Sequence, residues 1–250
     1  MTAYYNEIDP YAAQWLRNLI EAGHIAPGDV DERSIEDVCP SDLAAYTQCH
    51  FFAGIGVWSL ALRRAGWPDD VPVWTASCPC QPYSKAGKGF GFADDRHLWP
   101  AFYHLARERL PGRVFGEQVP GAIRHGWIDL VQSDMEASGY AFGAIRFGAH
   151  VTGEPIERQR IYFVAENLGE GMAGPKPGAN SCQTGPRRWR GEADMQALVS
   201  APFEPGSSWP QPIIRSVADE SAPSMGPLHA IGNALNAEAA TQFIAAYLAA

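Results

Sequence analysis

The 250-residue sequence lacks the features that mark membrane and secreted proteins. No apolar run approaches the roughly 18 residues that a membrane span requires. The amino terminus, Met1-Thr2-Ala3-Tyr4, lacks the basic and then apolar pattern of a secretion signal. We therefore expect a cytoplasmic protein with no membrane partner.

Cysteine is scarce and odd in number, with five residues: Cys39, Cys49, Cys78, Cys80 and Cys182. In a chain expected in the cytosol, this count argues against a disulfide framework and leaves the thiols available for chemistry. The close pair Cys78-Pro79-Cys80 is too tightly spaced for a zinc knuckle, and no matching His or Cys pair follows it. The sequence therefore predicts no metal site.

The sequence also lacks an excess of basic residues, and its formal net charge is −9 at pH 7. That charge alone argues against a nucleic-acid partner. The first fifty residues, however, hold nine acids against Arg17 and Arg33 and so carry most of the excess. Residues 155–191 hold six basic residues against three acids, and these six are Arg158, Arg160, Lys176, Arg187, Arg188 and Arg190. A locally positive face is thus available for phosphates.

The chain has 46% apolar residues, which is enough to bury the core of one large α/β domain. Short apolar strands alternate with amphipathic helices, and this pattern predicts a mostly parallel sheet covered on both faces. Strands are expected at 3–6, 48–52, 71–76, 114–117 and 161–165, and helices at 11–22, 58–65, 98–110 and 127–138. Asn236 is predicted to cap a last helix that packs back onto the main domain.

Two glycine-rich segments follow predicted strands. Phe52-Ala53-Gly54-Ile55-Gly56 lies between a strand and a helix, where glycines let a backbone approach a nucleoside cofactor; a tight turn without a ligand would look much the same. Ser77-Cys78-Pro79-Cys80-Gln81-Pro82-Tyr83-Ser84 follows the next strand, and a glycine-rich stretch, residues 86–91, comes after it. This placement favours a rigid nucleophile at the carboxyl edge of the sheet over a buried, inert thiol.

With these segments the chain resembles the DNA cytosine-5 methyltransferases. The glycine turn is similar to the family's first motif, and Pro79-Cys80-Gln81 with Ser84 is similar to its catalytic motif. Three later segments resemble further family motifs in the family's order: Gly116-Glu117-Gln118-Val119, Arg158-Gln159-Arg160 and Gly232-Asn233-Ala234. The resemblance implies a Rossmann-like class I sheet that binds S-adenosylmethionine, with a small target-recognition region.

Two cofactor motifs that the family places between the glycine turn and the cysteine are missing there, because only about twenty residues separate the two. Two upstream segments resemble these motifs instead. Asn6-Glu7-Ile8-Asp9-Pro10 is similar to the ribose-binding motif, and Gly28-Asp29-Val30 is similar to the adenine-contacting motif. We expect a rearranged order, in which residues 38–46 cross from the third strand past the second to the first. The alternative is that residues 1–46 form only an acidic, helical lid.

The resemblance also implies roles for single residues. Cys80 would add to carbon 6 of cytosine, because carbon 5 alone is too poor a nucleophile to attack a sulfonium methyl. Glu117, with a pKa raised by burial, would contact the ring nitrogen and amino group. Arg158 and Arg160 are predicted to lie on opposite sides of an extended segment, so that Arg160 contacts the base and Arg158 orients its neighbours. The implied cofactor-binding residues are Glu7, Ile8, Asp29, Val30, Phe52, Gly54, Ile55, Gly56, Pro79 and Asn233.

The implied partner is double-stranded DNA with the target nucleotide flipped out of the stack. The loop 84–95, with Lys85 and Lys88, is suited to closing over DNA. We expect the catalytic domain at 1–166, a target-recognition region at 167–225 and a returning helix in 226–250, in a monomer. The implied DNA-binding residues are Gln81, Ser84, Lys85, Lys88, Arg187, Arg188 and Arg190, the last three offering phosphate contacts or guanine reading.

Three departures from the family pattern keep alternatives open: Gln118 replaces Asn, Val57 replaces a frequent Gly, and Tyr83 replaces Phe. A reshaped pocket would allow a modified sulfonium donor that transfers a larger group. Action on tRNA and a catalytically silent nucleic-acid binder are further alternatives. A dinucleotide oxidoreductase explains the turn but not the other motifs, and Leu60 stands where its third glycine would be. By analogy, the rearranged order and the short recognition region are compatible with a phage or mobile-element enzyme.

Overall fold

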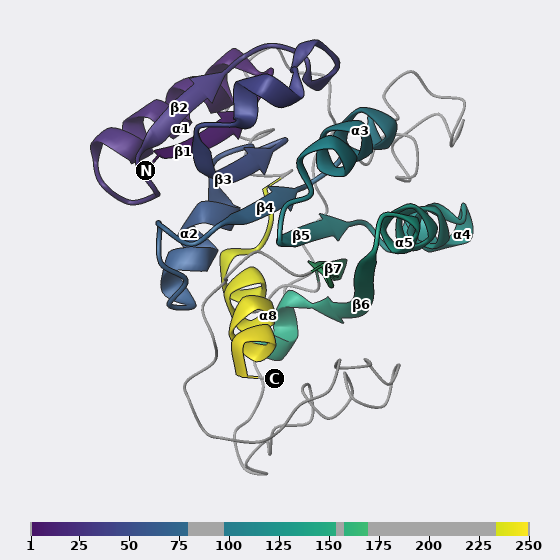
Figure 1. The fold of residues 1–250 in the computed structure, drawn as a ribbon. Coiled ribbons are helices and arrows are strands. Elements are labelled where there is room, and N and C mark those ends of the chain that lie inside the picture. The colour runs from purple at the N-terminus through teal and green to yellow at the C-terminus, as the bar shows by residue number, and fades with distance from the viewer. Residues whose placement is uncertain (1, 80–97, 154–157, 170–233, 250) are drawn as a thin grey trace, which may run out of the picture.

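The computed structural model describes residues 2–79, 98–153, 158–169 and 234–249, which fold around one seven-stranded sheet (Figure 1). The strand order is β2-β1-β3-β4-β5-β7-β6. The strands are β1 (Thr2–Asn6), β2 (Gly28–Asp31), β3 (Tyr46–Phe51), β4 (Val73–Ala76), β5 (Arg113–Gln118), β6 (Tyr140–Gly148) and β7 (Gln159–Asn167). The first five pair in parallel, whereas β7 is antiparallel to both β5 and β6. The expected Rossmann-like α/β class is confirmed.

The two strands that come first in the chain lie beside the strand of the glycine turn. β1 pairs with both β2 and β3. The connection from β2 passes β1 through two short helical turns, η1 (Ile35–Asp37) and η2 (Pro40–Leu43), before β3 begins. This is the expected crossover, and it excludes the alternative that residues 1–46 form a separate helical lid. Whether the relocated segments bind a cofactor stays a prediction.

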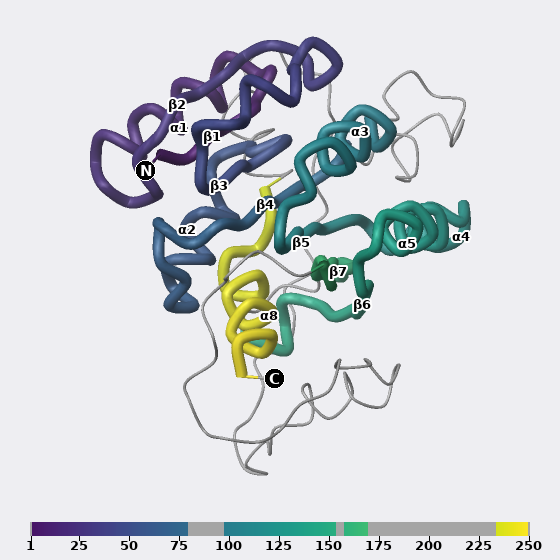
Figure 2. Tube along the Cα trace, viewed as in Figure 1, coloured from purple at the N-terminus to yellow at the C-terminus, as the bar shows by residue number. Residues whose placement is uncertain are grey.

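Helices cover both faces of the sheet, as Figure 2 shows along the same view. One face carries α1 (Pro10–Glu21), α2 (Val57–Arg64) and α8 (Ala237–Ala249). The other carries α3 (Trp99–Arg109) and α5 (Trp127–Ala137), with the single turn α4 (Gly121–Arg124) beside α5. The chain thus forms the three layers that alternating strands and amphipathic helices predict.

Local capping explains where the first and last helices begin. The Asp9 carboxylate accepts a hydrogen bond from the Ala12 amide, and Pro10 occupies the first helical position, where no backbone donor is needed. The Asn236 side chain accepts in the same way from the Ala239 amide, so the predicted cap of the last helix is confirmed. α8 then packs on α2 and on Phe115 of β5, which returns the carboxyl-terminal segment to the sheet.

Most predicted elements agree with the structure to within a few residues, but one strand was not anticipated. β6 has the sequence YAFGAIRFG, whose glycines and single β-branched residue give a weak strand signal. It forms because it pairs with β7 along its whole length. Phe52, expected to end a strand, lies beyond β3 with a φ of 52°. Among the described residues, no helix is both long and apolar enough to cross a membrane.

Candidate active site

The candidate site lies at the carboxyl edge of the sheet, between β1 and β3, where the order in which strands are added to the sheet reverses. From β1 the chain runs through α1 to β2 on one side, and from β3 through α2 to β4 on the other. In open α/β sheets, ligands bind in the crevice at such a switch point. The segment after β1, which begins with Glu7, and the glycine turn after β3 therefore share the position where a ligand is expected.

Glu7 reaches the glycine turn directly. Its Oε2 accepts a hydrogen bond of 2.7 Å from the Gly54 amide, and its Oε1 accepts one of 2.9 Å from the Asp9 amide. Burial raises the pKa of Glu7, although these amide hydrogen bonds act in the opposite direction. The structure thus brings together two residues that are 47 positions apart in the sequence.

The backbone of the turn is left-handed at three places. Phe52, Gly54 and Gly56 have φ values of 52°, 54° and 78°. The turn is tied to β1 by the Ala53 amide, which donates to the carbonyl of Asn6. A Cβ built on Gly54 meets no described atom within 4 Å, so the backbone here is open to a ligand. A left-handed Phe is uncommon, and such strain is typical of functional turns.

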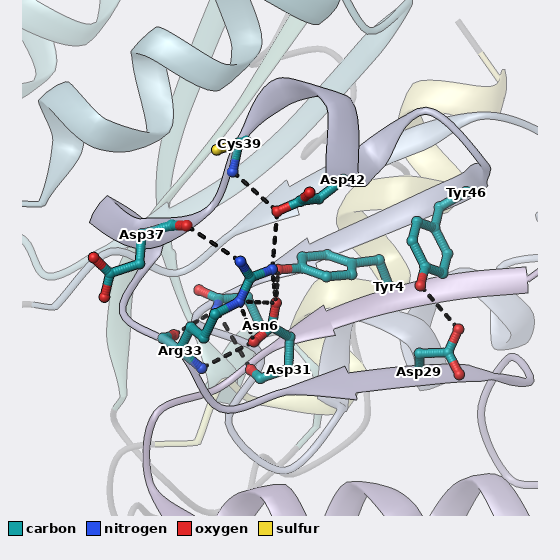
Figure 3. A network of polar contacts seen from close by, with 9 residues as sticks. All are labelled: Tyr4, Asn6, Asp29, Asp31, Arg33, Asp37, Cys39, Asp42 and Tyr46. Carbon is teal, nitrogen blue, oxygen red and sulfur yellow. Dashed lines mark hydrogen bonds and ion pairs between the residues drawn. The ribbon is translucent and has the colours of Figure 1, made fainter.

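Asp29 and Val30 are placed less well for a cofactor than the resemblance implies. Asp29 lies two residues before the end of β2, and its carboxylate accepts a 2.9 Å hydrogen bond from the hydroxyl of Tyr46 at the start of β3 (Figure 3). Val30 packs against the apolar cluster beneath α1. Ile8, in contrast, is 65% exposed beside Glu7.

Arg33 organises the end of β2, as Figure 3 shows. Its guanidinium pairs with Asp31 at 2.7 Å and with Asp42 at 2.9 Å, and the Tyr4 hydroxyl also donates to Asp31. Burial alone would raise the pKa of Asp31, but the hydrogen bonds from Arg33 and Tyr4 outweigh it, so the pKa is lowered. One of the two basic residues among the first fifty thus neutralises part of the acidic excess and ties η2 to the sheet.

The segment that leads to the candidate nucleophile follows β4. Cys78 is buried, and burial raises the pKa of its thiol, with the charge of Glu117 acting in the same direction. A thiol held protonated is a poor nucleophile. This supports Cys80 over Cys78 as the candidate, although Cys80 itself lies outside the described residues. Pro79, which separates them, is the last described residue of this segment.

Glu117 and Arg160 form an ion pair near the carboxyl end of β5. Arg160 Nε lies 2.5 Å from Glu117 Oε1. Burial raises the pKa of Glu117, and the charges of Arg160 and Arg158 partly offset that effect. A carboxyl group with these properties, at a sheet edge, is suited to giving or sharing a proton.

The prediction that Arg158 and Arg160 lie on opposite sides is wrong. Residues two apart on an extended segment project to the same face. Accordingly, both guanidinium groups act on the charge of Glu117. Arg158 also donates a 2.7 Å hydrogen bond to the carbonyl of Ala234, which immediately precedes the segment leading into α8. It therefore ties the returning chain to the site.

Several predicted site residues lie outside the described residues: Cys80, Gln81, Ser84, Lys85, Lys88, Arg187, Arg188, Arg190 and Asn233. Their roles stay predictions, as do the boundaries of the recognition region. Within the described residues, the structure brings Glu7 together with the glycine turn, and Glu117 together with both arginines.

Sequence reasoning missed three residues at this edge. Arg33 was counted only as a charge, Trp58 only as the start of a helix, and Ser77 only as part of the cysteine segment. The Arg33–Asp42 contact joins positions 9 residues apart and the Trp58–Ser77 contact joins positions 19 apart, so no local pattern signals them. The indole of Trp58 donates to Ser77 Oγ at 2.9 Å.

Comparison with known proteins agrees with this site. The family model for the C-5 cytosine-specific DNA methylase matches residues 66–181. That range holds the cysteine segment, Glu117 and both arginines. Over these residues, which make up a little less than half of its length, the chain is similar to the C-5 cytosine-specific DNA methylases.

Individual relatives match parts of the chain. The type II methyltransferase M.AluI of Cellulosimicrobium cellulans is 29% identical over 150 residues, which cover 55% of this chain and 27% of that protein. M.HhaI of Haemophilus parahaemolyticus is 33% identical over 99 residues, which cover 38% and 30%. The matches thus span about a third or less of these two relatives' own lengths.

Solved structures also resemble the chain. The methyltransferase EhMeth of Entamoeba histolytica aligns with a TM-score of 0.47 and 17% identity, over 66% of this chain and 45% of that one. A putative DNA modification methyltransferase encoded within an E. coli prophage aligns with a TM-score of 0.34 and 16% identity, over 67% and 47%.

Proposed function

We propose that the protein transfers a methyl group from S-adenosylmethionine to carbon 5 of a cytosine in duplex DNA, through a temporary bond between the base and Cys80. The observation that carries the proposal is the ion pair between buried Glu117 and partly buried Arg160 near the carboxyl end of β5. It supplies a proton-sharing carboxyl, held in place, on the strand next to the one that leads to Cys80.

The residues at the switch point fit the cofactor. Glu7 offers a carboxylate to the hydroxyls of a ribose, and the turn 52–56 offers an open backbone at Gly54. When bound, S-adenosylmethionine supplies an electrophilic methyl group. The family match covers residues 66–181, so the glycine turn and the upstream segments lie outside it, and their cofactor role is part of this proposal.

The chain's own residues divide the remaining work. The Cys80 thiolate adds to carbon 6, and Glu117 contacts the ring nitrogen and stabilises the electron-rich ring that results. Arg160 keeps the Glu117 carboxyl aimed at the base. After transfer, loss of the carbon 5 proton lets the bond to sulfur break. The base must leave the helix stack for this chemistry, at a cost of a few kcal/mol.

A fluorinated substrate tests the covalent step. In an oligonucleotide duplex containing 5-fluorocytosine at the target, carbon 5 cannot lose a proton, so we expect a cross-linked complex that survives a denaturing gel when S-adenosylmethionine is present. Cys80→Ser should abolish the cross-link, whereas Cys39→Ser, which alters an exposed thiol, should not. If the wild-type protein never cross-links to any duplex that contains its methylation site, the proposal is wrong.

Product analysis separates the alternatives. DNA and tRNA are each incubated with the enzyme and donor and then digested to nucleosides. Mass spectrometry gives the masses of the nucleosides. We expect a gain of one methyl on cytosine from DNA. A larger mass gain would indicate a modified donor, a product from tRNA alone would indicate an RNA substrate, and no product with retained DNA binding would indicate a silent binder.

Cofactor affinity tests the relocated segments. Glu7→Ala should weaken binding of S-adenosylmethionine by about tenfold or more, because a charge-assisted hydrogen bond is lost. Asp29→Ala should have the smaller effect, since Asp29 lies two residues before the end of β2 and so does not reach the carboxyl edge of the sheet. Isothermal titration measures both. Unchanged affinity in both variants would remove the claim that the cofactor motifs have moved upstream.

A further inference from the structure

A hydrogen bond joins the helix after the glycine turn to the segment before Cys80. Trp58 is the second residue of α2, and Ser77 directly follows β4. The Trp58 indole Nε1 donates to Ser77 Oγ at 2.9 Å. The Ser77 amide in turn donates to the carbonyl of Phe51, the last residue of β3, at 3.4 Å. Ser77 is thus held through both its side chain and its backbone.

The indole is fixed by the core beneath α2. Trp58 is 3% exposed, stacks on Phe115 with ring centroids 6.3 Å apart, and meets the edge of Tyr162 at 6.4 Å. A buried indole has one donor, and that donor needs a partner. The direction of the N–H is therefore determined by packing, and the Ser77 hydroxyl must meet it.

A second contact approaches the same segment from β5. The Gln118 side chain is fully buried; its Nε2 donates a long, 3.5 Å hydrogen bond to the carbonyl of Cys78, and its Oε1 accepts from the Val119 amide at 2.9 Å. Side chains from α2 and β5 therefore hold two consecutive residues, 77 and 78. Pro79 follows with a restricted φ, so the direction in which the chain leaves is constrained.

We propose that Trp58 and Ser77 form a positioning pair that sets the direction in which the chain enters Pro79-Cys80, and with it the rate at which the Cys80 sulfur attacks. The inference rests on the proposed function, because it takes Cys80 as the nucleophile. Neither residue touches the substrate. Their effect passes through Cys78 and Pro79, so it is expected in the rate of the sulfur's reactions and not in cofactor affinity.

The test is a double-mutant cycle with Trp58→Phe, which removes only the N–H donor and the second ring, and Ser77→Ala, which removes the acceptor. The rate of Cys80 alkylation by iodoacetamide, located by fragment mass spectrometry, is measured beside kcat and the KM for S-adenosylmethionine. Ser77→Thr keeps the hydroxyl as a rescue. Trp67→Phe is the matched control, since its indole donates to Val71 in the same core but away from the cysteine segment.

We expect each single variant to change the alkylation rate and kcat by about fivefold, the effect of one neutral hydrogen bond, and the double variant to change them no further. The KM for S-adenosylmethionine should stay near the wild-type value in every variant. Ser77→Thr and Trp67→Phe should also keep alkylation rates and kcat values near those of the wild-type protein. The inference would be overturned if the fold-changes of the two single variants multiplied in the double variant. An equal fold-change in Trp67→Phe would overturn it too. So would a Ser77→Thr variant as impaired as Ser77→Ala.

The alkylation readout separates this inference from the proposed function. If the wild-type enzyme makes no methylcytosine but the cycle for Cys80 alkylation is non-additive, the proposed function fails and the pair still positions the thiol. If methylation depends on Cys80 but the cycle is additive, the proposed function stands and the positioning pair is wrong.

Discussion

Two carboxylates at the sheet edge, partly buried Glu7 and buried Glu117, have environments that suit different tasks. Glu7 accepts from two backbone amides, which orient its oxygens toward the glycine turn. Glu117 pairs with a guanidinium instead. Burial raises the pKa of both. The hydrogen-bonding partner therefore distinguishes the roles expected of the two carboxylates. The backbone amides hold the Glu7 oxygens at the place expected for a ribose, whereas Arg160 holds the Glu117 carboxyl next to the segment expected to receive the base.

His50 is a further buried titratable group, one residue before the end of β3. Its ring stacks on Tyr5, its Nδ1 shares a 2.9 Å hydrogen bond with Thr75, and its Nε2 has no hydrogen-bond partner among the described residues. Burial lowers the pKa of His50 to about 3. The folded protein thus holds a neutral imidazole where the unfolded chain binds a proton below about pH 6.5.

We expect the free energy of unfolding to fall as the pH drops below 6.5, because the unfolded state then binds the proton that folded His50 does not. The slope is about 1.4 kcal/mol per pH unit until the folded pKa is reached. In His50→Gln, the difference between the unfolding free energies at pH 7.5 and pH 5 should shrink by up to about 2 kcal/mol. Urea denaturation at both pH values measures it.

The control for this prediction is His104→Gln, which changes an exposed histidine. It should keep the pH dependence of the wild-type protein. If His50→Gln and the wild-type protein lose the same stability between pH 7.5 and pH 5, the buried imidazole is not the source of the acid sensitivity.

At the scale of elements, the antiparallel part of the sheet depends on one glycine. Gly116 lies on β5 opposite Phe163 of β7. A Cβ at Gly116 would overlap the Phe163 ring, which packs between the sheet and α5. The Phe163 ring lies against the backbone of Gly116, where no side chain could fit. This contact explains why a glycine occupies the middle of a central strand, although glycine usually weakens strand pairing.

Gly116→Ala should therefore lower the free energy of unfolding by about 1–3 kcal/mol, as an overpacked core does. Gly143→Ala on β6 is the matched control, because a Cβ there meets only Val164 at 4.0 Å, an ordinary contact. Urea denaturation of both variants gives the comparison. Equal stability of the two variants would mean that Phe163 moves aside without cost.

At the level of the whole molecule, the amino-terminal unit, residues 1–45, completes the sheet. β1 lies between β2 and β3, so it has hydrogen-bond partners on both sides. Tyr5, Leu16 and Ile25 form an apolar cluster that also packs against Ala53 of the glycine turn. The switch point exists only because this unit is present, since Glu7 follows β1 and the glycine turn follows β3.

A chain shortened to residues 46–250 should not fold to a stable monomer, because it exposes the edge of β3 and half of that cluster. Size-exclusion chromatography and circular dichroism should show aggregation or loss of structure. Adding a fragment of residues 1–45 should restore part of the ordered, monomeric species. A stable, monomeric 46–250 chain would show that the unit is an appendage and not an integral part of the sheet.

Much of this arrangement was readable from local pattern. The apolar runs, the glycine turn, the cap at Asn236 and the family motifs are short-range features, because helix periodicity, strand alternation and turn chemistry act over a few residues. The place of the two amino-terminal strands beside β3 was also predictable, since the length between Val38 and Tyr46 allows one crossover. β6 was not, because its strand conformation comes from pairing with β7.

The sequence by itself determined which residue types stand at the sheet edge: an acid after β1, glycines after β3, cysteines after β4 and a carboxylate in β5. Only the tertiary structure decided how they meet. It brought Glu7 to the Gly54 amide, turned Asp29 toward Tyr46, placed both arginines on the side of Glu117, and joined Trp58 to Ser77. These contacts depend on register and packing between segments far apart in the chain, which no local rule encodes.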